Sequence, residues 1–212
     1  MNEARSLQAV TNCASYLRYL KALQAKEITE VTLADLAEET HINPETVRED
    51  MQAIADSGEE TQQVAMLSTC IRHYLGYDDV CTAVLVGVGN MGSAILSYRG
   101  FEDYGIDIVA AFDRDSAVIG TNVADKKIRD VAELPEVCHQ AQVLIGILAV
   151  PAHEAQQVCN EMLAAGIRAI WNFAPTQLQV PAGILVKNEN IADSLLTFSG
   201  LVEQTLKSRE EA

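Results

Sequence analysis

A glycine-rich segment in the middle of the chain has the spacing G-x-G-x-x-G. It consists of Gly87, Val88, Gly89, Asn90, Met91 and Gly92. An apolar run at 83–86 precedes it, and a helical pattern from Ser93 follows. In such a turn the first glycine permits the bend, the second lets the backbone approach a pyrophosphate, and the third lets the helix pack on the strand. Because N–H groups at a helix start attract phosphate, the segment predicts a dinucleotide site; a ligand-free turn is the alternative.

An acidic residue ends the second apolar run, 21 positions after Gly92. This residue, Asp113, follows the run 108–112. A carboxylate there can accept hydrogen bonds from an adenosine ribose, and its charge repels a 2′-phosphate. Arg114 comes next and opposes that preference, because a guanidinium can receive the same phosphate. We expect both residues at the nucleotide site and a preference for NAD(H) over NADP(H).

Side chains suited to catalysis or metal binding are scattered. The histidines share no motif: His41, His73, His139 and His153. Only His153 follows a strand end where it could approach a bound cofactor, and a histidine at a helix start is more often a cap or surface residue. The five cysteines lack C-x-x-C spacing, which fits core residues in a reducing cytoplasm. We expect no catalytic residue and no metal site, with a small dehydrogenase as an alternative.

The composition excludes several classes of protein. The chain has 212 residues, 49% of them hydrophobic, and a formal net charge of −15. Its longest apolar runs, such as 143–150, are too short to span a bilayer. Residues 1–30 lack the basic start and apolar core of a signal peptide. We therefore expect a cytoplasmic protein of one or two domains with no membrane partner.

Strands and helices alternate in the second part of the chain. Apolar runs predict strands near 83–87, 107–112, 143–149, 168–173 and 184–187, and periodic stretches predict helices near 90–98, 153–165 and 191–208. This α/β alternation predicts a Rossmann domain over 80–190, a doubly wound parallel sheet with helices on both faces. The last helix has apolar residues on more than one face, so we expect 191–212 to dock on a partner chain.

The first part of the chain has the organisation of a helix-turn-helix. An apolar stripe predicts a helix over 7–25. Thr32 is placed to cap a second helix, and Asn43 to cap a third with Pro44 in its first position. These elements predict a winged-helix domain over 1–79.

The region after the third predicted helix is polar. Residues 56–66 predict a wing or hairpin, and 71–77 a short linking helix. Residues 1–79 contain six basic and fourteen acidic residues, a formal net charge of −8. Because DNA-binding domains usually carry a basic footprint, the charge of this domain argues against the DNA binding that its organisation suggests.

The chain resembles the Rex family of redox-sensing transcriptional repressors over nearly its whole length. The matching segments are 84–115, Tyr98-Arg99-Gly100-Phe101, Ala149-Val150-Pro151-Ala152 and Asn172-Phe173-Ala174-Pro175. The resemblance implies a winged-helix domain, a Rossmann domain that binds NADH and NAD+, and a homodimer that exchanges its C-terminal helix. In the family the last two motifs flank the nicotinamide, which makes Val150, Pro151, Asn172, Phe173, Ala174 and Pro175 expected cofactor contacts. NAD+ favours DNA binding in the family, and NADH releases the operator.

The resemblance also implies a redox switch formed by a tyrosine, an arginine and an acid near the last helix. Tyr98 and Arg18 match the first two. The family's acid position is Ala192 here, and Asp193 follows one place later. Tyr98 has a second interpretation, a core tyrosine.

The recognition helix and wing depart from the family pattern. Arg48 holds the family's arginine position, with Asn43 and Thr46 as further candidates for DNA contact. The family's lysine is replaced by Glu49, and its basic pair in the wing by Glu59-Glu60. From 45 to 60 there are one basic and six acidic residues, a net charge of −5. Since phosphate contacts supply most non-specific DNA affinity, we expect weak or absent operator binding. A paralogue that acts through a protein partner is therefore an alternative to the plain repressor.

Overall fold

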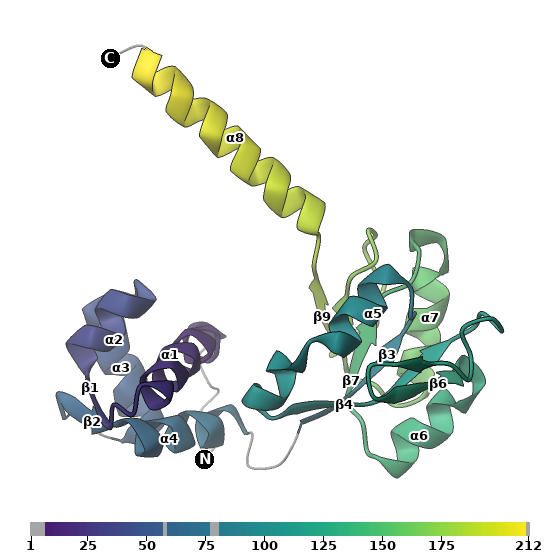
Figure 1. Cartoon of the computed structure of the whole chain (residues 1–212), viewed down its shortest axis with the longest axis horizontal. Helices are drawn as coiled ribbons and strands as arrows, with labels where there is room; N and C mark the ends of the chain where they lie inside the picture. The colour runs from purple at the N-terminus through teal and green to yellow at the C-terminus, as the bar shows by residue number, and fades with distance from the viewer. Residues whose placement is uncertain (1–6, 57–58, 77–80, 211–212) are drawn as a thin grey trace. The chain divides into compact units, whose positions relative to one another are not determined.

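Figure 1 shows the chain as a computed structural model in which residues 7–56, 59–76 and 81–210 are described. The chain forms two compact units, residues 1–79 and residues 80–212. Within the described ranges, no helix is both long and apolar enough to cross a membrane.

The first unit consists of helices and one small sheet. Its elements are α1 (Leu7–Ala25), β1 (Glu30–Thr32), α2 (Leu33–Thr40), α3 (Pro44–Ala55), β2 (Thr61–Gln63) and α4 (Val64–Leu75). Strands β1 and β2 pair antiparallel, with Val31 opposite Gln62. The predicted winged-helix fold is confirmed: α2 and α3 form the helix-turn-helix, and β2 lies in the stretch predicted as a wing. Residues 57 and 58 of that stretch lie outside the described residues.

Helix α4 begins earlier than the sequence predicted. We expected a short helix over 71–77, and the helix starts at Val64. Its buried residues Val64, Leu67 and Ile71 are spaced three and four apart, as one face of a helix requires. Residues 64–66 were assigned to the predicted wing, so the start of this helix was missed.

The two predicted helix caps are present. Thr32 Oγ1 accepts the N–H of Asp35 at 3.0 Å, and the Asp35 carboxylate accepts the N–H of Thr32 at 3.2 Å. Asn43 Oδ1 accepts the N–H of Glu45 at 2.9 Å, with Pro44 beginning α3. Each such cap stabilises its helix by about 1 kcal/mol. The Thr32 cap fixes the start of α2, and the Asn43 cap fixes the end of the turn between α2 and α3.

A buried carboxylate joins α3 to α1. Asp50 accepts the amide of Asn12 at 2.8 Å and the hydroxyl of Tyr16 at 2.7 Å. Burial and the charge of Asp50 raise the pKa of the nearby Cys13 thiol to about 12. Burial and the hydrogen bond to Asp50 also raise the pKa of Tyr16. Asp50 therefore faces the core of this unit, not solvent.

The second unit is built on a seven-stranded sheet with the order β5-β6-β4-β3-β7-β8-β9. The strands are β3 (Cys81–Val86), β4 (Ile106–Asp113), β5 (Asn122–Val123), β6 (Lys126–Asp130), β7 (Ile145–Leu148), β8 (Ala169–Asn172) and β9 (Leu185–Asn188). All neighbouring pairs are parallel except β5 with β6. When β5 is left out and the other six strands are numbered 1 to 6 as they occur along the chain, their order across the sheet is 3-2-1-4-5-6. This order confirms the predicted Rossmann fold.

Besides two short 3-10 helices (Arg99–Tyr104 and Val131–Glu133), three elements of this unit were not predicted. They are β5, β6 and α6 (Leu134–Gln140). In β6 only Ile128 is buried among charged neighbours, because the strand lies next to the edge of the sheet. Helix α6 has only seven residues and contains Pro135 in its first turn. Both β6 and α6 are too short to show a repeating pattern of apolar residues in the sequence.

Successive residues of β3 point to opposite faces of the sheet. Val84 and Val86 pack with α6 and with α7 (Ala152–Ala164). Ala83 and Leu85 pack with α5 (Asn90–Ser97) and with the partly buried rings of Phe101, Trp171 and Phe173. The helices on both faces were predicted, and the aromatic cluster beside α5 was not.

The last helix, α8 (Ile191–Glu210), continues from β9 and is yellow in Figure 1. Five large apolar residues on it are exposed: Leu195, Leu196, Phe198, Leu201 and Val202. A row of exposed leucines and an aromatic ring is unusual on a monomer surface.

Candidate functional site

The glycine turn lies between β3 and α5, where two of its glycines are required by close backbone contacts. Gly87 has a φ of +96°, and a Cβ there would lie 2.5 Å from the carbonyl oxygen of Ala149. A Cβ on Gly92 would lie 1.9 Å from the carbonyl oxygen of Gly87. Gly89 differs, because no heavy atom lies within 4 Å of its would-be Cβ. The open space at Gly89 is where a pyrophosphate would approach the backbone.

A cavity of about 270 Å³ opens at this turn. Its lining includes the predicted residues Gly87, Val88, Gly89, Asp113, Arg114, Val150 and Pro151. Helix α5 begins at Asn90 without a side-chain cap, so N–H groups of its first turn are available to a phosphate. Met91 is exposed beside it. Val118 and Glu154 also line the cavity, and no motif in the sequence pointed to either.

The acid that ends β4 is held in place by backbone groups. Asp113 Oδ2 accepts the N–H of Val88 at 2.7 Å. Its Oδ1 accepts the N–H of Arg114 at 2.7 Å and that of Asp115 at 2.9 Å. The carboxylate is thereby oriented at the cavity wall. The guanidinium of Arg114 forms an ion pair with Glu161 on α7.

The predicted nicotinamide motifs follow neighbouring strands. Val150 and Pro151 follow β7, and Phe173 to Pro175 follow β8, at the carboxyl edge of the sheet where Rossmann ligands bind. Asn172 is fully buried, and its Oδ1 accepts the N–H of Ala174 at 3.0 Å. The residues from 172 to 175 do not line the 270 Å³ cavity at the glycine turn.

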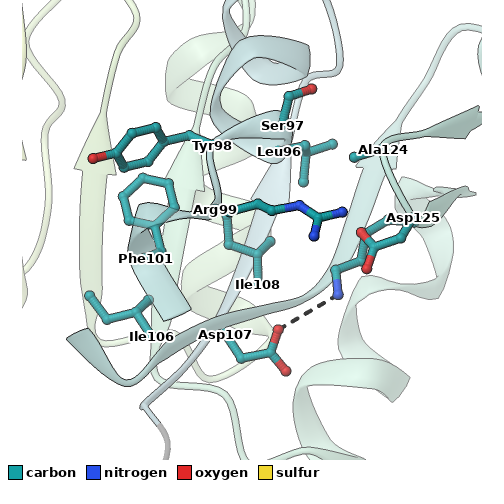
Figure 2. A pocket seen from close by; sticks show the side chains of 11 residues that line it. Leu96, Ser97, Tyr98, Arg99, Phe101, Ile106, Asp107, Ile108, Ala124 and Asp125 are labelled. Carbon is teal, nitrogen blue, oxygen red and sulfur yellow. Dashed lines mark ion pairs between the residues drawn. The ribbon is translucent and has the colours of Figure 1, made fainter. Parts of the chain in front are cut away.

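Tyr98 lies at the end of α5 with 60% of its surface exposed, which excludes the interpretation as a core tyrosine. Its ring packs edge-on against Phe101 at 5.0 Å between centroids. Figure 2 shows the two rings together at one side of a small cavity of about 110 Å³. The Tyr98 hydroxyl points away from the ion pair between Asp107 and Lys126, which spans 3.6 Å in that cavity.

The other two predicted switch residues lie on separate elements. Arg18 is exposed on α1. Asp193 is exposed in the first turn of α8, where its N–H donates to Asn190 Oδ1 at 3.3 Å. Arg18 belongs to the first unit, whereas Tyr98 and Asp193 belong to the second.

The predicted DNA-contacting residues surround the start of α3. Asn43 is used as a helix cap, and Thr46 is half-buried. Arg48 is exposed, with its guanidinium 3.4 Å from Glu45 and 3.3 Å from Glu60. Five of the six acids between 45 and 60 are exposed, whereas Asp50 points into the core and adds nothing to the acidic surface.

The remaining candidates for chemistry are an exposed histidine and the free thiols. His153 is 78% exposed at the start of α7 and lies 3.4 Å from Glu154. All five cysteines are free thiols, and burial raises the pKa of Cys81, Cys138 and Cys159. Among the described residues, no three His, Cys, Asp or Glu side chains are grouped as a metal site.

A winged-helix unit joined to a Rossmann unit with an open nucleotide site defines the class of ligand-responsive DNA-binding regulators. The redox-sensing transcriptional repressor Rex of Clostridium beijerinckii is 37% identical over 173 residues, which cover 81% of this chain and 82% of that protein. Rex of Rhodopirellula baltica is 41% identical over 163 residues, which cover 76% of this chain and 69% of that protein. The chain therefore belongs to the Rex family of redox-sensing transcriptional repressors.

Family models and solved structures agree with this assignment. A model described as a CoA binding domain matches residues 80–176, and one described as "Putative DNA-binding protein N-terminus" matches residues 13–51. The Rex-family repressor RSP, solved with β-NADH, has a TM-score of 0.85 and 26% identity, with full coverage of both chains. RSP solved with β-NAD+ and operator DNA has a TM-score of 0.84 and 28% identity, and covers 99% of this chain and 98% of RSP.

Proposed function

We propose that this chain is a cytoplasmic regulator that binds NADH and NAD+ and couples their ratio to the occupancy of an operator. The observation that carries the proposal is the glycine turn, where Gly89 is open to a phosphate and Asp113 is fixed at the cavity wall. RSP, which has the same fold, has been solved with each form of the cofactor. The relatives are named as repressors, which supports regulation over catalysis.

Its cofactor preference follows from two side chains. Asp113 would place a negative charge beside a 2′-phosphate, which disfavours NADP(H). Arg114 is the residue that could counter this repulsion, and its ion pair with Glu161 directs it toward α7. The preferred ligand is therefore NAD(H).

The working assembly is a homodimer in which α8 packs against the other subunit. The exposed Leu195, Leu196 and Phe198 support this, because burial of such side chains contributes roughly 1.5–3 kcal/mol each. The redox switch is formed in that assembly by Arg18, Tyr98 and Asp193. Their exposure leaves all three able to meet partners when two subunits associate.

A second candidate is a Rex-type NAD(H)-binding protein with weak operator affinity that acts through a protein partner. Its support is the ion pairing of Arg48 with Glu45 and Glu60, which neutralises the one basic residue in this stretch of α3 and the wing. The relatives described above are named as repressors, and RSP was solved with operator DNA. The first candidate is therefore preferred.

One experiment separates these functions. NADH and NAD+ are titrated by nicotinamide fluorescence and calorimetry, with coenzyme A as a control ligand because residues 80–176 match a CoA binding domain. Mobility shifts on a Rex-family operator are then measured with each cofactor. Operator binding that NADH weakens supports the redox regulator, and NADH binding without operator binding supports the second candidate. Turnover of hydroxy acids, alcohols or aldehydes with NADH would establish an oxidoreductase instead.

A further inference from the structure

Two hydrogen bonds fasten the end of β8 to the residue that leads into α8. The backbone N–H of Glu189 donates to the carbonyl of Asn172 at 2.8 Å. The indole N–H of Trp171 donates to Glu189 Oε1 at 3.1 Å. Only Asn190 separates Glu189 from α8. A shift at the end of β8 therefore acts directly on the start of α8.

The side chain of Asn172 strengthens this connection. Its Nδ2 donates to the carbonyl of Thr176 and to Asn188 Oδ1, both at 2.8 Å. With its Oδ1 bound to the N–H of Ala174, the buried amide ties the turn after β8 to the end of β9. Buried polar groups of this kind are costly to leave unpaired, so the turn and the end of β9 move together.

The side chain of Trp171 links three features of the site. Its ring centroid lies 4.6 Å from that of Phe173 in the nicotinamide motif and 5.9 Å from that of Phe101. Phe101 in turn contacts Tyr98. The Trp171 indole N–H also donates to Glu189. A single side chain therefore contacts Phe173 in the nicotinamide motif, Glu189 just before α8, and Phe101, against which Tyr98 packs.

We propose that Trp171 and Glu189 are positioning residues that couple the state of the nicotinamide to the direction of α8. This rests on the proposed binding of NADH and NAD+. The oxidised nicotinamide ring carries a positive charge and the reduced ring does not, and aromatic faces attract cations. A nicotinamide ring bound beside Phe173 therefore interacts with the indole of Trp171 differently in its oxidised and reduced states. The indole N–H passes that difference to Glu189 and so to α8, as coupling between sites requires.

The test is amide hydrogen exchange in residues 192–202 of α8 in the full-length chain, measured with NADH and with NAD+. In the unmodified protein the two cofactors give different exchange rates. Glu189→Met removes the acceptor for Trp171, and Trp171→Phe removes the donor and keeps an aromatic ring. Both variants are expected to lose the difference in α8. Glu189→Met, whose site does not contact the nicotinamide motif, is expected to bind NADH as the unmodified protein does.

Two matched variants isolate the hydrogen bond from charge. Glu189→Gln removes the charge, as Glu189→Met does, but keeps an oxygen that can accept the indole N–H. The difference in α8 exchange between NADH and NAD+ should therefore persist. Lys187→Met removes only the exposed ion pair that Lys187 makes with Glu189 at 3.0 Å, and the difference again persists. The inference is overturned if Glu189→Met retains the difference, or if the unmodified protein binds both cofactors without it. Absence of NADH binding by the unmodified protein overturns the proposed function itself and this inference with it.

Discussion

The carboxylate of Asp113 accepts the backbone N–H of Val88 at 2.7 Å, so the end of β4 is tied directly to the glycine turn. Two further N–H groups, from Arg114 and Asp115, bind the other carboxylate oxygen. Three backbone donors hold the charge of Asp113 at the cavity wall. The position of this charge relative to a bound ribose is therefore set by the backbone and varies little with side-chain motion.

Asp113→Ala should narrow the preference for NADH over NADPH. Loss of the repelling charge is expected to change the affinity ratio roughly tenfold, which corresponds to ~1.4 kcal/mol. Titration of nicotinamide fluorescence measures both affinities. Glu161→Gln is the companion variant, because it releases Arg114 and should raise NADPH affinity alone. Equal or tighter NADPH binding by the unmodified chain would contradict the preference.

Two glycine variants should separate folding from ligand approach. Gly92→Ala places a Cβ 1.9 Å from the carbonyl oxygen of Gly87, so the backbone must shift and thermal stability should fall. Gly89→Ala meets no atom within 4 Å, so the protein should unfold at an unchanged temperature. Its methyl group nevertheless occupies the space of a pyrophosphate, and NADH affinity should drop. Unchanged NADH affinity in Gly89→Ala would contradict the prediction that the pyrophosphate binds at this turn.

Deleting residues from Ala192 onward should convert the proposed homodimer into monomer or aggregate. A milder variant, Leu195→Glu with Phe198→Glu, changes only exposed positions and should give a folded monomer. Light scattering coupled to size-exclusion chromatography measures the mass. A monodisperse dimer after the truncation would show that another surface holds the subunits together.

The network around Asp50 should make the first unit sensitive to alkaline pH. Folding raises the pKa of Cys13 from 9.0 to about 12, so above about 9 the unfolded chain releases a proton that the folded chain keeps. Unfolding free energy should therefore fall with pH from 9 toward 12, and Tyr16 acts in the same direction. Denaturant titrations across this range measure the slope, and Cys13→Ala should reduce it. Tyr16→Phe should cost about 1–3 kcal/mol at neutral pH because Asp50 loses a donor.

Restoring basic residues should raise affinity for Rex-family operators. Glu49→Lys, Glu59→Lys and Glu60→Arg together replace three acids, and loss of Glu60 also releases Arg48 from one ion pair. Each new phosphate contact should steepen the dependence of log affinity on log salt by about 0.9. Mobility shifts at several salt concentrations give that slope. Tight, NADH-sensitive operator binding by the unmodified chain at about 0.15 M salt, the physiological ionic strength, would show that the acidic face does not prevent repression.

The sequence by itself determined the features that depend on near neighbours along the chain. The sequence predicted the glycine turn, the caps at Thr32 and Asn43, and the alternation of the long strands and helices. Each of these features shows itself in a pattern of residues close together along the chain. The carboxyl-edge position of 172–175 also followed, since parallel strands bring their ends to one edge.

The tertiary structure alone decided which distant side chains meet. In the sequence Asp50 was only one of six acids between 45 and 60, and the structure shows that Asn12 and Tyr16 on α1 bind it in the core. The pairing of Arg114 with Glu161 and of Trp171 with Glu189 joins residues on different elements, for which sequence spacing carries no signal. Strand β6 was missed because pairing with β4 stabilises it more than its own apolar content. Contacts across elements depend on packing in three dimensions, and a local pattern does not encode them.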